Sequence, residues 1–380
     1  MAPAPGDPLL TEVGQDLLAS LGPYREQDTE RLSRSLRAKG HDPDLVASAL
    51  TQQRLRLKAQ QKLGERAARM LLTDAGLQQA TRWVIAKSHA QRFVKAGCKT
   101  VLDMTCGIGA DALAFAAAGL SVTAVELDPR TAAFARHNLA EFPNARVVQG
   151  DSLLLRHQDF DGIFADPARR DARGRTFNPA DYSPPLQSVL DLRKAVPNLG
   201  VKVAPGIPYS AIPDDACAQW ISVDSAVVEA GLWFGDLRDR PGRSALVIRG
   251  QESQSLWAGD RPGAPAEMVS PAPLGKYLYN PDGAVVRSGG LATLAAMLDA
   301  APVSDQIAYL SGDHLNRTPF ATAFEVLEVV PLKKLKGRLR ELEVGSLEIF
   351  KRGVDLDPDS YRTSLKLKGQ GSATVVLTRL

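Results

Sequence analysis

The chain has 380 residues, of which 44% are hydrophobic and 23% charged, and its net charge is +3. This is the composition of a globular protein of two or three domains, and it excludes collagen-like, disordered and disulfide-rich chains. No apolar run reaches the roughly 18 residues of a membrane-spanning helix, and the first residues lack a secretory-signal pattern, so we expect no membrane partner. Three cysteines without C-x-x-C spacing and five histidines without ligand spacing predict no disulfide, no metal and a cytoplasmic location.

The charge is distributed unevenly along the chain. Residues 51–100 hold 11 basic and 2 acidic residues, and residues 331–380 hold 11 basic and 6 acidic ones. The segment between them, residues 101–330, has a net charge of −8. Two basic flanks around an acidic centre are typical of a protein whose outer segments bind a polyanion.

Residues 9–95 predict an all-helical region, and we place an N-terminal helical domain at residues 1–92. Apolar residues recur there at spacings of three and four, and Asp42 before Pro43 predicts a helix start after a break at Gly40. Farther along, basic residues at helical spacing would form one stripe, which either contacts RNA phosphates or merely faces solvent. The stripe consists of Arg54, Lys58, Lys62, Arg66 and Arg69.

From about residue 99, short β-branched runs alternate with helical stretches, which predicts an α/β domain with a mostly parallel sheet at residues 93–255. The last two runs, 220–230 and 244–249, are separated by a loop too short for a crossover helix. We expect these two runs to form a terminal antiparallel hairpin. The other predicted strands are 100–104, 121–125, 146–148, 162–165 and 200–204.

Residues 250–273 are rich in Ser, Gly and Pro and predict a linker. Beyond it we expect a small α+β domain at residues 270–380. Its predicted elements are a helix at 291–298 and strands at 306–310, 324–330, 344–351 and 373–379.

A glycine-rich turn after the first predicted strand is the most informative feature. Asp103 ends the strand, and Gly107 and Gly109 permit a sharp turn and let a ligand approach the backbone at the start of a helix. Such a turn alone is weak evidence, because dinucleotide enzymes and packing turns also use it. Glu126 ends the next strand, where a carboxylate can accept both ribose hydroxyls. Asp151 follows the third strand, where it can accept from an adenine amino group.

This order of motifs resembles class I S-adenosylmethionine-dependent methyltransferases over about residues 100–250. The resemblance implies a Rossmann-like α/β fold and S-adenosyl-L-methionine as cofactor. A nicotinamide-dependent dehydrogenase is the alternative, but it would not need Asp151. Cys106 within the turn could be a nucleophile for carbon methylation, although a packing role is favoured. The expected cofactor-binding residues are Asp103, Thr105, Gly107, Gly109, Asp111, Glu126, Asp151 and Ser152.

The fourth predicted strand ends in the sequence D-P-A-R-R at residues 166–170. Ligands of α/β sheets bind beyond the carboxyl ends of the strands, so Asp166 should lie beside the transferred methyl group. The loop resembles the [DN]-P-P-[YF] motif of nucleic-acid amino-methyltransferases, but Ala168 replaces the second proline and Arg169 the aromatic residue. Arg169 could stack on a base, clamp a phosphate or guanine edge, or simply cap the loop. We expect Asp166, Pro167 and Arg169 to be the catalytic residues.

The chain as a whole resembles a family of bacterial class I methyltransferases with a C-terminal THUMP-like domain, over residues 50–380. The motifs that carry the resemblance are residues 77–82, 84–92, 103–111, 166–170, 202–207, 344–353, 365–369 and 375–379. The catalytic half is also similar to trimethylguanosine synthases. THUMP domains are associated with tRNA-modifying enzymes, so the resemblance implies an RNA substrate. Lys351 and Arg352, after a predicted strand, and the basic residues of 333–340 fit an RNA contact surface.

We therefore expect an enzyme that methylates a base amino group in structured RNA, either tRNA or rRNA. Two alternatives stay open. One is a small-molecule or protein methyltransferase of the same fold, whose binding would depend little on salt. The other is a non-catalytic RNA-binding protein with a residual cofactor pocket, which a cofactor titration would test.

Overall fold

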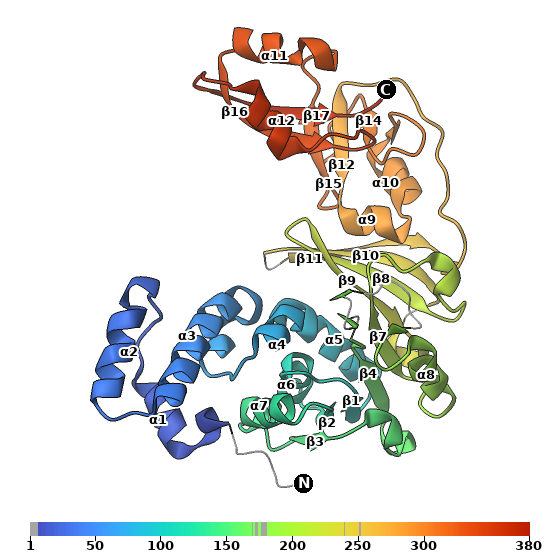
Figure 1. The fold of residues 1–380 in the computed structure, drawn as a ribbon. Coiled ribbons are helices and arrows are strands. Elements are labelled where there is room, and N and C mark those ends of the chain that lie inside the picture. Colours follow the sequence, from blue (N-terminus) through green and yellow to red (C-terminus); the bar gives the residue numbers. More distant parts are fainter. Residues whose placement is uncertain (1–6, 169, 172–173, 176–180, 239, 251) are drawn as a thin grey trace. The chain divides into compact units, whose positions relative to one another are not determined.

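The computed structural model describes residues 7–168, 170–171, 174–175, 181–238, 240–250 and 252–380 (Figure 1). The chain divides into two compact units, which are described separately. The first comprises residues 1–203 and 232–239, and the second comprises residues 204–231 and 240–380. Among the described residues, no helix is long and apolar enough to cross a membrane.

The first unit begins with helices, as predicted. The helix start at Asp42 is confirmed: its Oδ1 accepts hydrogen bonds from the amides of Asp44 and Leu45 at 2.9 and 3.0 Å. These helices bury a leucine-rich core together with Phe134 of the following α/β region. The helices are α1 (Glu12–Ser20), α2 (Thr29–Ala38), α3 (Pro43–Leu63), α4 (Asp74–Gln79) and α5 (Trp83–Lys95), with 3₁₀ turns at Pro8–Leu10, Glu26–Asp28 and Gly64–Ala68.

The predicted basic stripe is not carried by one continuous helix. Helix α3 ends at Leu63 because Gly64 has φ +63°, and a 3₁₀ turn follows. Arg66 and Arg69 therefore leave the face that holds Arg54, Lys58 and Lys62. The spacing pattern could not reveal this break, since a glycine inside a helical pattern is often tolerated.

A parallel sheet forms the centre of the first unit, in the order β7-β4-β1-β2-β3. Its five strands are confirmed with ends within one residue of the prediction. Figure 1 shows α6 and α7 on one side of this sheet and α8 on the other. The elements are β1 (Thr100–Asp103), α6 (Ala110–Ala117), β2 (Ser121–Glu126), α7 (Pro129–Leu139), β3 (Ala145–Gln149), β4 (Gly162–Ala165), β5 (Arg170–Asp171), β6 (Gly174–Arg175), α8 (Leu186–Asp191) and β7 (Leu199–Val203).

The sheet does end in an antiparallel hairpin, but the runs 220–230 and 244–249 do not form it. The first run contains parts of two strands, because Asp224 and Ser225 both have positive φ, 48° and 71°, and reverse the chain. β10 pairs with β8 in parallel, and its antiparallel partner is β11. The strands are β8 (Cys217–Val223), β9 (Ala226–Trp233, whose last two residues belong to the first unit), β10 (Gly242–Arg249) and β11 (Glu252–Gly259), in the order β11-β10-β8-β9.

The predicted linker therefore contains a strand. β11 lies at the end of the strand order, and its first four residues are exposed. A strand exposed in this way needs no apolar alternation, which is why its polar sequence resembled a linker.

The rest of the second unit contains two smaller sheets. Predicted helix 291–298 and strand 344–351 are confirmed; the strand expected at 373–379 begins and ends two residues earlier. The strands expected at 306–310 and 324–330 overlap the observed ones only at their ends. The first sheet comprises β12 (Tyr277–Pro281), β13 (Ala301–Pro302), β14 (Leu310–Gly312) and β15 (Ala321–Glu325), with α9 (Gly283–Ser288) and α10 (Leu291–Leu298).

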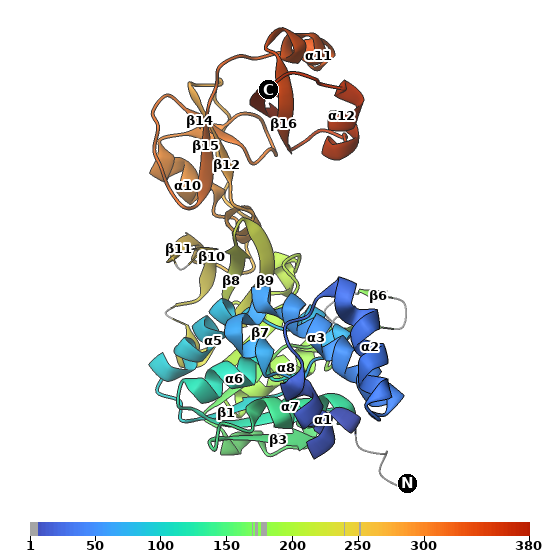
Figure 2. The same cartoon turned by 90° about the vertical axis from the view of Figure 1, so that its left-hand side faces the viewer.

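The C-terminal module follows this sheet. Its two strands pair in parallel, and both helices pack beside β16 (Figure 2). Leucines from all four elements form one core. The elements are α11 (Leu332–Glu341), β16 (Val344–Lys351), α12 (Pro358–Leu365) and β17 (Gly371–Leu377).

Candidate active site

The turn after β1 is shaped by two glycines in the left-handed region, Gly107 at φ +54° and Gly109 at φ +90°. Gly109 precedes the first residue of α6. The turn is anchored by the amide of Cys106, which donates to the carbonyl of Val125 at 2.9 Å. A Cβ added to Gly107 would meet no atom within 4 Å, so the backbone there borders open space. The turn can therefore be approached closely by a ligand at the carboxyl edge of the sheet.

Glu126, at the end of β2, lies against this turn. Its Oε2 accepts from the amide of Gly107 at 3.1 Å, and its Oε1 accepts from the amide of Asp128 at 2.8 Å. These bonds hold the carboxylate in one orientation. Each carboxylate oxygen keeps a second lone pair, so Glu126 can accept the two hydroxyls of a ribose.

Asp103 is 1% exposed at the end of β1. Its Oδ1 accepts from the amide of Thr105 at 3.3 Å, and its Oδ2 has no hydrogen-bond partner among the described residues. Burial, and then the neighbouring Asp111 carboxylate, raises the pKa of Asp103 well above its usual value. A cationic group would satisfy this orphaned oxygen. The turn, Glu126 and Asp103 thus fit an adenosine that carries an amino acid, with the ammonium at Asp103.

The remaining predicted cofactor residues are of two kinds. Asp151 is exposed after β3, and its Oδ1 accepts from the amide of Leu153 at 2.9 Å at the start of a 3₁₀ turn, where Ser152 is buried. Asp111, by contrast, is buried in α6, and both of its carboxylate oxygens have protein partners. The geometry therefore gives Asp111 an organising role in the network described next.

A chain of buried polar contacts leads away from Asp166. Lys202 Nζ donates to Asp166 Oδ2 at 2.6 Å and to Thr81 Oγ1 at 2.7 Å. Thr81 Oγ1 donates to Asp111 Oδ2 at 2.5 Å, and Asp111 Oδ1 lies 2.9 Å from His89 Nδ1. The side chain of Lys202 is 7% exposed and that of Asp166 is 24% exposed. The ammonium is thus shared between the two carboxylates, directly with Asp166 and through Thr81 with Asp111.

The electrostatics of this network favour the ionised form of Asp111. Burial by itself would raise the pKa of Asp111, but the hydrogen bond from His89 and the charge of Lys202 lower it overall. An ionised carboxylate only accepts hydrogen bonds, so His89 is the donor in its contact with Asp111. The ammonium of Lys202, 2.6 Å from Asp166 Oδ2, places a positive charge directly beside that side chain as well.

The loop after β4 is tied to the glycine turn. The amide of Asp166 donates to Thr105 Oγ1 at 2.7 Å, so Thr105 links the two halves of the site. Ala168 and Ser183 exchange two backbone hydrogen bonds, at 2.9 and 3.0 Å. Pro167 is buried, and Arg169 lies outside the described residues. The carboxylate predicted to be catalytic is therefore held on a loop that is hydrogen-bonded to the glycine turn. This turn, Glu126 and Asp103 together are named the cofactor cradle.

Sequence reasoning did not single out Lys202, Thr81 and His89 as site residues. All three lie in motifs that carried the family resemblance. The signal that could have found Lys202 is a lysine in the middle of a buried strand, since every residue of β7 is buried. Lysine is almost never buried without a partner, so this position implied a nearby carboxylate.

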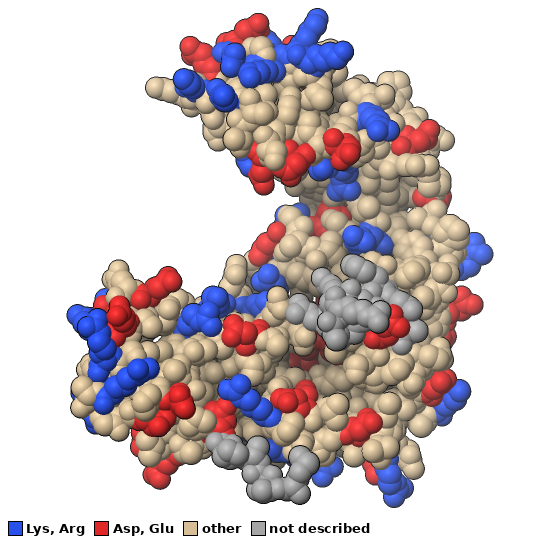
Figure 3. All heavy atoms as spheres, in the orientation of Figure 1, with Lys and Arg blue, Asp and Glu red and all other residues tan. Residues whose placement is uncertain are grey.

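The first part of the predicted RNA-binding stripe is only partly available to a ligand. Lys62 Nζ donates to the carbonyls of Leu77 and Gln78 at 2.9 and 2.8 Å, near the end of α4. Arg54 lies 3.7 Å from Asp74, whereas Lys58 is exposed. Figure 3 shows acidic and basic side chains interleaved over these N-terminal helices on the face drawn.

The other predicted RNA-binding residues are also placed unevenly. Arg66 stacks on the ring of Trp83 at 3.6 Å, and Arg69 lies 3.9 Å from Glu141. Arg352 is half-buried and donates to Asn280 Oδ1 and to the carbonyl of Pro281, at 3.0 and 2.8 Å. Burial lowers the pKa of Arg352.

Lys351 is exposed at the end of β16. The exposed members of the predicted RNA-binding set are thus Lys58, Arg66, Arg69 and Lys351, while Lys62 and Arg352 donate hydrogen bonds to backbone carbonyls.

Comparison with known proteins agrees with this geometry. Family models match residues 101–171 as a methyltransferase domain, residues 321–380 as THUMP domain-like, and residues 7–59 as a domain of unknown function. Proteins of Mycobacterium tuberculosis strains CDC 1551 / Oshkosh and ATCC 25618 / H37Rv are each 36% identical over 349 residues, or 89% of this chain and 93% of theirs. Both are described as uncharacterized S-adenosylmethionine-dependent methyltransferases.

A solved structure shows the same fold. The crystal structure of a Porphyromonas gingivalis W83 protein, named as a methyltransferase, has a TM-score of 0.72 and 20% identity, covering 94% of this chain and 96% of that one. The cofactor cradle, the anchored loop that carries Asp166 and the similarity to these relatives agree with one another. The chain belongs to the S-adenosylmethionine-dependent methyltransferases, uses S-adenosylmethionine as its cofactor and carries a THUMP-like domain at residues 321–380.

Proposed function

We propose that this methyltransferase modifies a base amino group in structured RNA, either tRNA or rRNA. The observation that carries the proposal is the Asp166 carboxylate, which Lys202 holds at 2.6 Å on the loop after β4. The cofactor supplies an electrophilic methyl group. Asp103 would hold its ammonium, Glu126 its ribose and Asp151 its adenine.

Asp166 has the chemistry that an amino target needs. As an ionised carboxylate it accepts hydrogen bonds and cannot donate them, so it selects an N–H group rather than a carbonyl oxygen. Lys202 donates to one oxygen of this carboxylate at 2.6 Å, and because each carboxylate oxygen has two lone pairs, the group can also accept from the target. The carbonyl of Pro167 would accept the second N–H and so turn the nitrogen lone pair toward the methyl group. Alignment of this kind supplies most of the rate in an in-line displacement, and no strong base is needed.

The distribution of charge along the chain and the THUMP-like domain support RNA as the molecule that carries the target amino group. Residues 51–100 have 11 basic and 2 acidic residues, and the THUMP-like segment lies in the basic C-terminal region. Lys58 and Lys351 would contact phosphates, and Arg169 would contact the target base or a phosphate. A small-molecule enzyme would not need these basic segments on either side of the acidic centre.

The test uses RNA from a strain that lacks the gene, incubated with the protein and isotopically labelled S-adenosylmethionine. Nucleosides are then separated and identified by mass spectrometry. We expect label on the amino group of one base with the wild-type protein. Label only in proteins or small metabolites of an added cell extract would overturn the proposal.

Variants of Asp166 test the catalytic assignment. Asp166→Asn keeps an acceptor and should retain part of the activity, whereas Asp166→Ala should lose about 100-fold or more. Asp159→Ala is the matched control, because Asp159 is an exposed carboxylate of the same unit, paired only loosely with Arg156 at 3.8 Å. Calorimetric titration with S-adenosylmethionine checks that each variant still binds cofactor. An Asp166→Ala protein as active as the control would contradict the assignment.

A further inference from the structure

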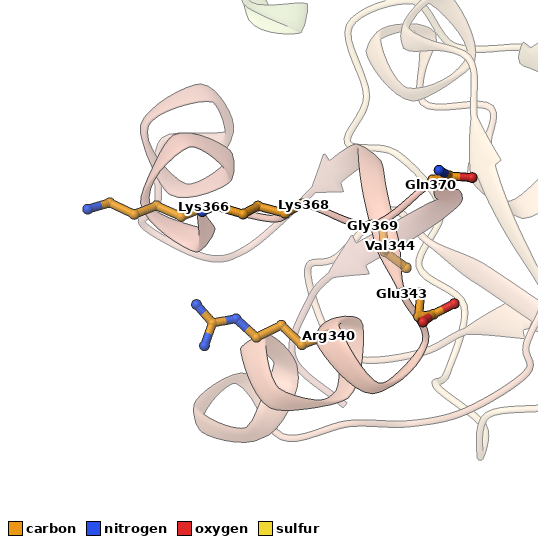
Figure 4. Close-up of a pocket in the computed structure, with 7 residues that line it drawn as sticks. All are labelled: Arg340, Glu343, Val344, Lys366, Lys368, Gly369 and Gln370. Atoms are coloured by element: carbon orange, nitrogen blue, oxygen red, sulfur yellow. The ribbon is translucent and has the colours of Figure 1, made fainter.

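The C-terminal module contains a cavity of about 760 Å³ that the catalytic reasoning does not use (Figure 4). It lies between the end of α11, the start of β16 and the loop that joins α12 to β17. Three of the residues that line it are cations, Arg340, Lys366 and Lys368, and one, Glu343, is an acid. Its volume is in the range of pockets that hold small organic ligands, and it exceeds the space that one phosphate group needs.

Two backbone segments beside this cavity, residues 343–345 and 369–371, pack directly against each other. The amide of Gly371 donates to the carbonyl of Glu343 at 2.9 Å, and the amide of Gly369 donates to the carbonyl of Val344 at 3.3 Å. A Cβ on Gly369 would come within 1.7 Å of the Glu343 carbonyl oxygen, and one on Gly345 within 1.8 Å of the Gly369 carbonyl oxygen. Only glycine permits this approach, and it fixes the loop that carries Lys366 and Lys368 relative to Arg340.

Lys366 occupies a position where glycine would be the easier choice. It has φ +49° directly after the last residue of α12, the left-handed site at which helices commonly place glycine. A side chain there adds backbone strain, and such strain persists where the surrounding structure and a function require it. Lys366 therefore holds a conformation that glycine would adopt with less strain.

The three cations differ in their ion pairing from an arginine nearby. Arg338, on the same helix, pairs with Glu328 at 2.8 Å and with Glu341 at 3.0 Å. By contrast, no ion pair involves Arg340, Lys366 or Lys368 within the part of the chain that the structure describes. Figure 4 shows these three side chains extending to the same side, while the carboxylate of Glu343 points away from them. Three cations against one acid, with no ion pair among these described residues, favour an anion at this place.

We propose that this pocket binds a phosphodiester of an unpaired stretch of RNA, through Arg340, Lys366 and Lys368. The inference rests on RNA being the substrate and adds a second contact, in the C-terminal module. A concave site suits a single strand, whose backbone can bend into it, better than a duplex, whose phosphates follow a regular convex surface. An acidic peptide is the other class of polyanion, and the basic character of the whole segment 331–380 favours the longer nucleic acid chain.

The test measures binding of a short fluorescent single-stranded oligoribonucleotide to the full-length protein over a range of salt concentrations. The variant Lys366→Gln/Lys368→Gln should bind about tenfold more weakly near 0.15 M salt. Its salt slope should be smaller in magnitude by about 0.7, because the one phosphate contact proposed for the pocket contributes about 0.7 on a single strand. Arg340→Gln should have about half of this effect on the slope.

The matched control is Lys276→Gln/Arg317→Gln, which removes two exposed cations of the same unit outside the pocket. Pocket variants with the affinity and salt slope of this control would overturn the inference, as would competition by poly-glutamate as strong as competition by unlabelled RNA. Methylation of RNA by the wild-type protein is assayed in parallel. If that methylation is present while the pocket variants bind normally, only the pocket assignment fails. If it is absent while binding depends on the pocket, only the proposed function fails.

Discussion

Replacing Lys202 with methionine removes the ammonium that lies 2.6 Å from Asp166 and 2.7 Å from Thr81, and it keeps an unbranched chain. Removing one partner of a buried ion pair costs about 3–5 kcal/mol, because the other charge is left without compensation. The Asp166 side chain is 24% exposed, so water can partly replace the ammonium. We therefore expect the free energy of unfolding to fall by about 3 kcal/mol, at the low end of this range.

The same variant should lose activity without losing the cofactor. Lys202 is a positioning residue, since its ammonium donates to Asp166 and Thr81 and would act on the target through Asp166. A positioned group displaced by about 1 Å costs about 100-fold in rate, so kcat should fall by about that factor. Affinity for S-adenosylmethionine should be nearly unchanged, and Lys202→Arg should recover part of kcat because it restores the charge.

Urea denaturation, calorimetric cofactor titration and methyl transfer to RNA measure these three quantities. The control is Lys194→Met, whose ammonium lies 3.1 Å from Asp191 but is 82% exposed. A surface pair of this kind contributes little to stability, because water screens it. If Lys202→Met and Lys194→Met have equal unfolding energies and equal kcat, the buried pair does not hold Asp166 and the reasoning is refuted.

Three further predictions concern the cofactor cradle and its support. Burial raises the pKa of Asp103, so above about pH 4 the unfolded chain loses a proton that the folded protein still holds there. This carboxyl group therefore lowers the stability of the folded protein as the pH rises from about 4 toward the raised pKa. An ammonium at Asp103 would expel the proton; calorimetry in buffers of different ionisation enthalpy should therefore detect proton release and tighter cofactor binding at higher pH, both absent in Asp103→Asn. Glu126→Gln keeps the shape but removes the charge that strengthens bonds to ribose hydroxyls, so cofactor affinity should fall about 10- to 100-fold, and an unchanged affinity would contradict the ribose role. Asn138→Ala removes three buried hydrogen bonds, from the amide of Leu71 at 2.7 Å and to the carbonyls of Leu71 and Ile108 at 3.0 and 2.9 Å; at about 1 kcal/mol each, urea denaturation should register a loss of about 3 kcal/mol, and a loss below about 1 kcal/mol would argue against this bridge.

Local patterns were sufficient for most of the first unit. The Asp42 cap follows from the chemistry of the capping residue, which needs only neighbouring amides. The five parallel strands follow from short β-branched runs, because strands buried on both faces are apolar along their whole length. The glycine turn and Glu126 follow from their positions at strand ends, since the carboxyl ends of parallel strands meet at one edge.

The sequence did not reveal how distant segments of the second unit pair with one another. The run 220–230 gave no sign of the turn at Asp224 and Ser225, because two residues at positive φ leave little trace in a hydropathy pattern. Polar β11 was mistaken for a linker, since a strand with one exposed end needs few apolar residues. The parallel pairing of β10 with β8 depends on contacts between segments that no local rule connects.

By itself the sequence determined the class of fold, the cofactor and the loop that carries Asp166, because each depends on residue types at the ends of neighbouring strands. Only the tertiary structure brought Thr81, His89 and Lys202 from three separate segments to Asp111 and Asp166. It also gathered Arg340, Lys366 and Lys368 around one cavity. Charge along a chain indicates what kind of partner a protein meets. Which charges neutralise one another and which remain for that partner depends on distances of a few ångströms, and these exist only once the chain is folded.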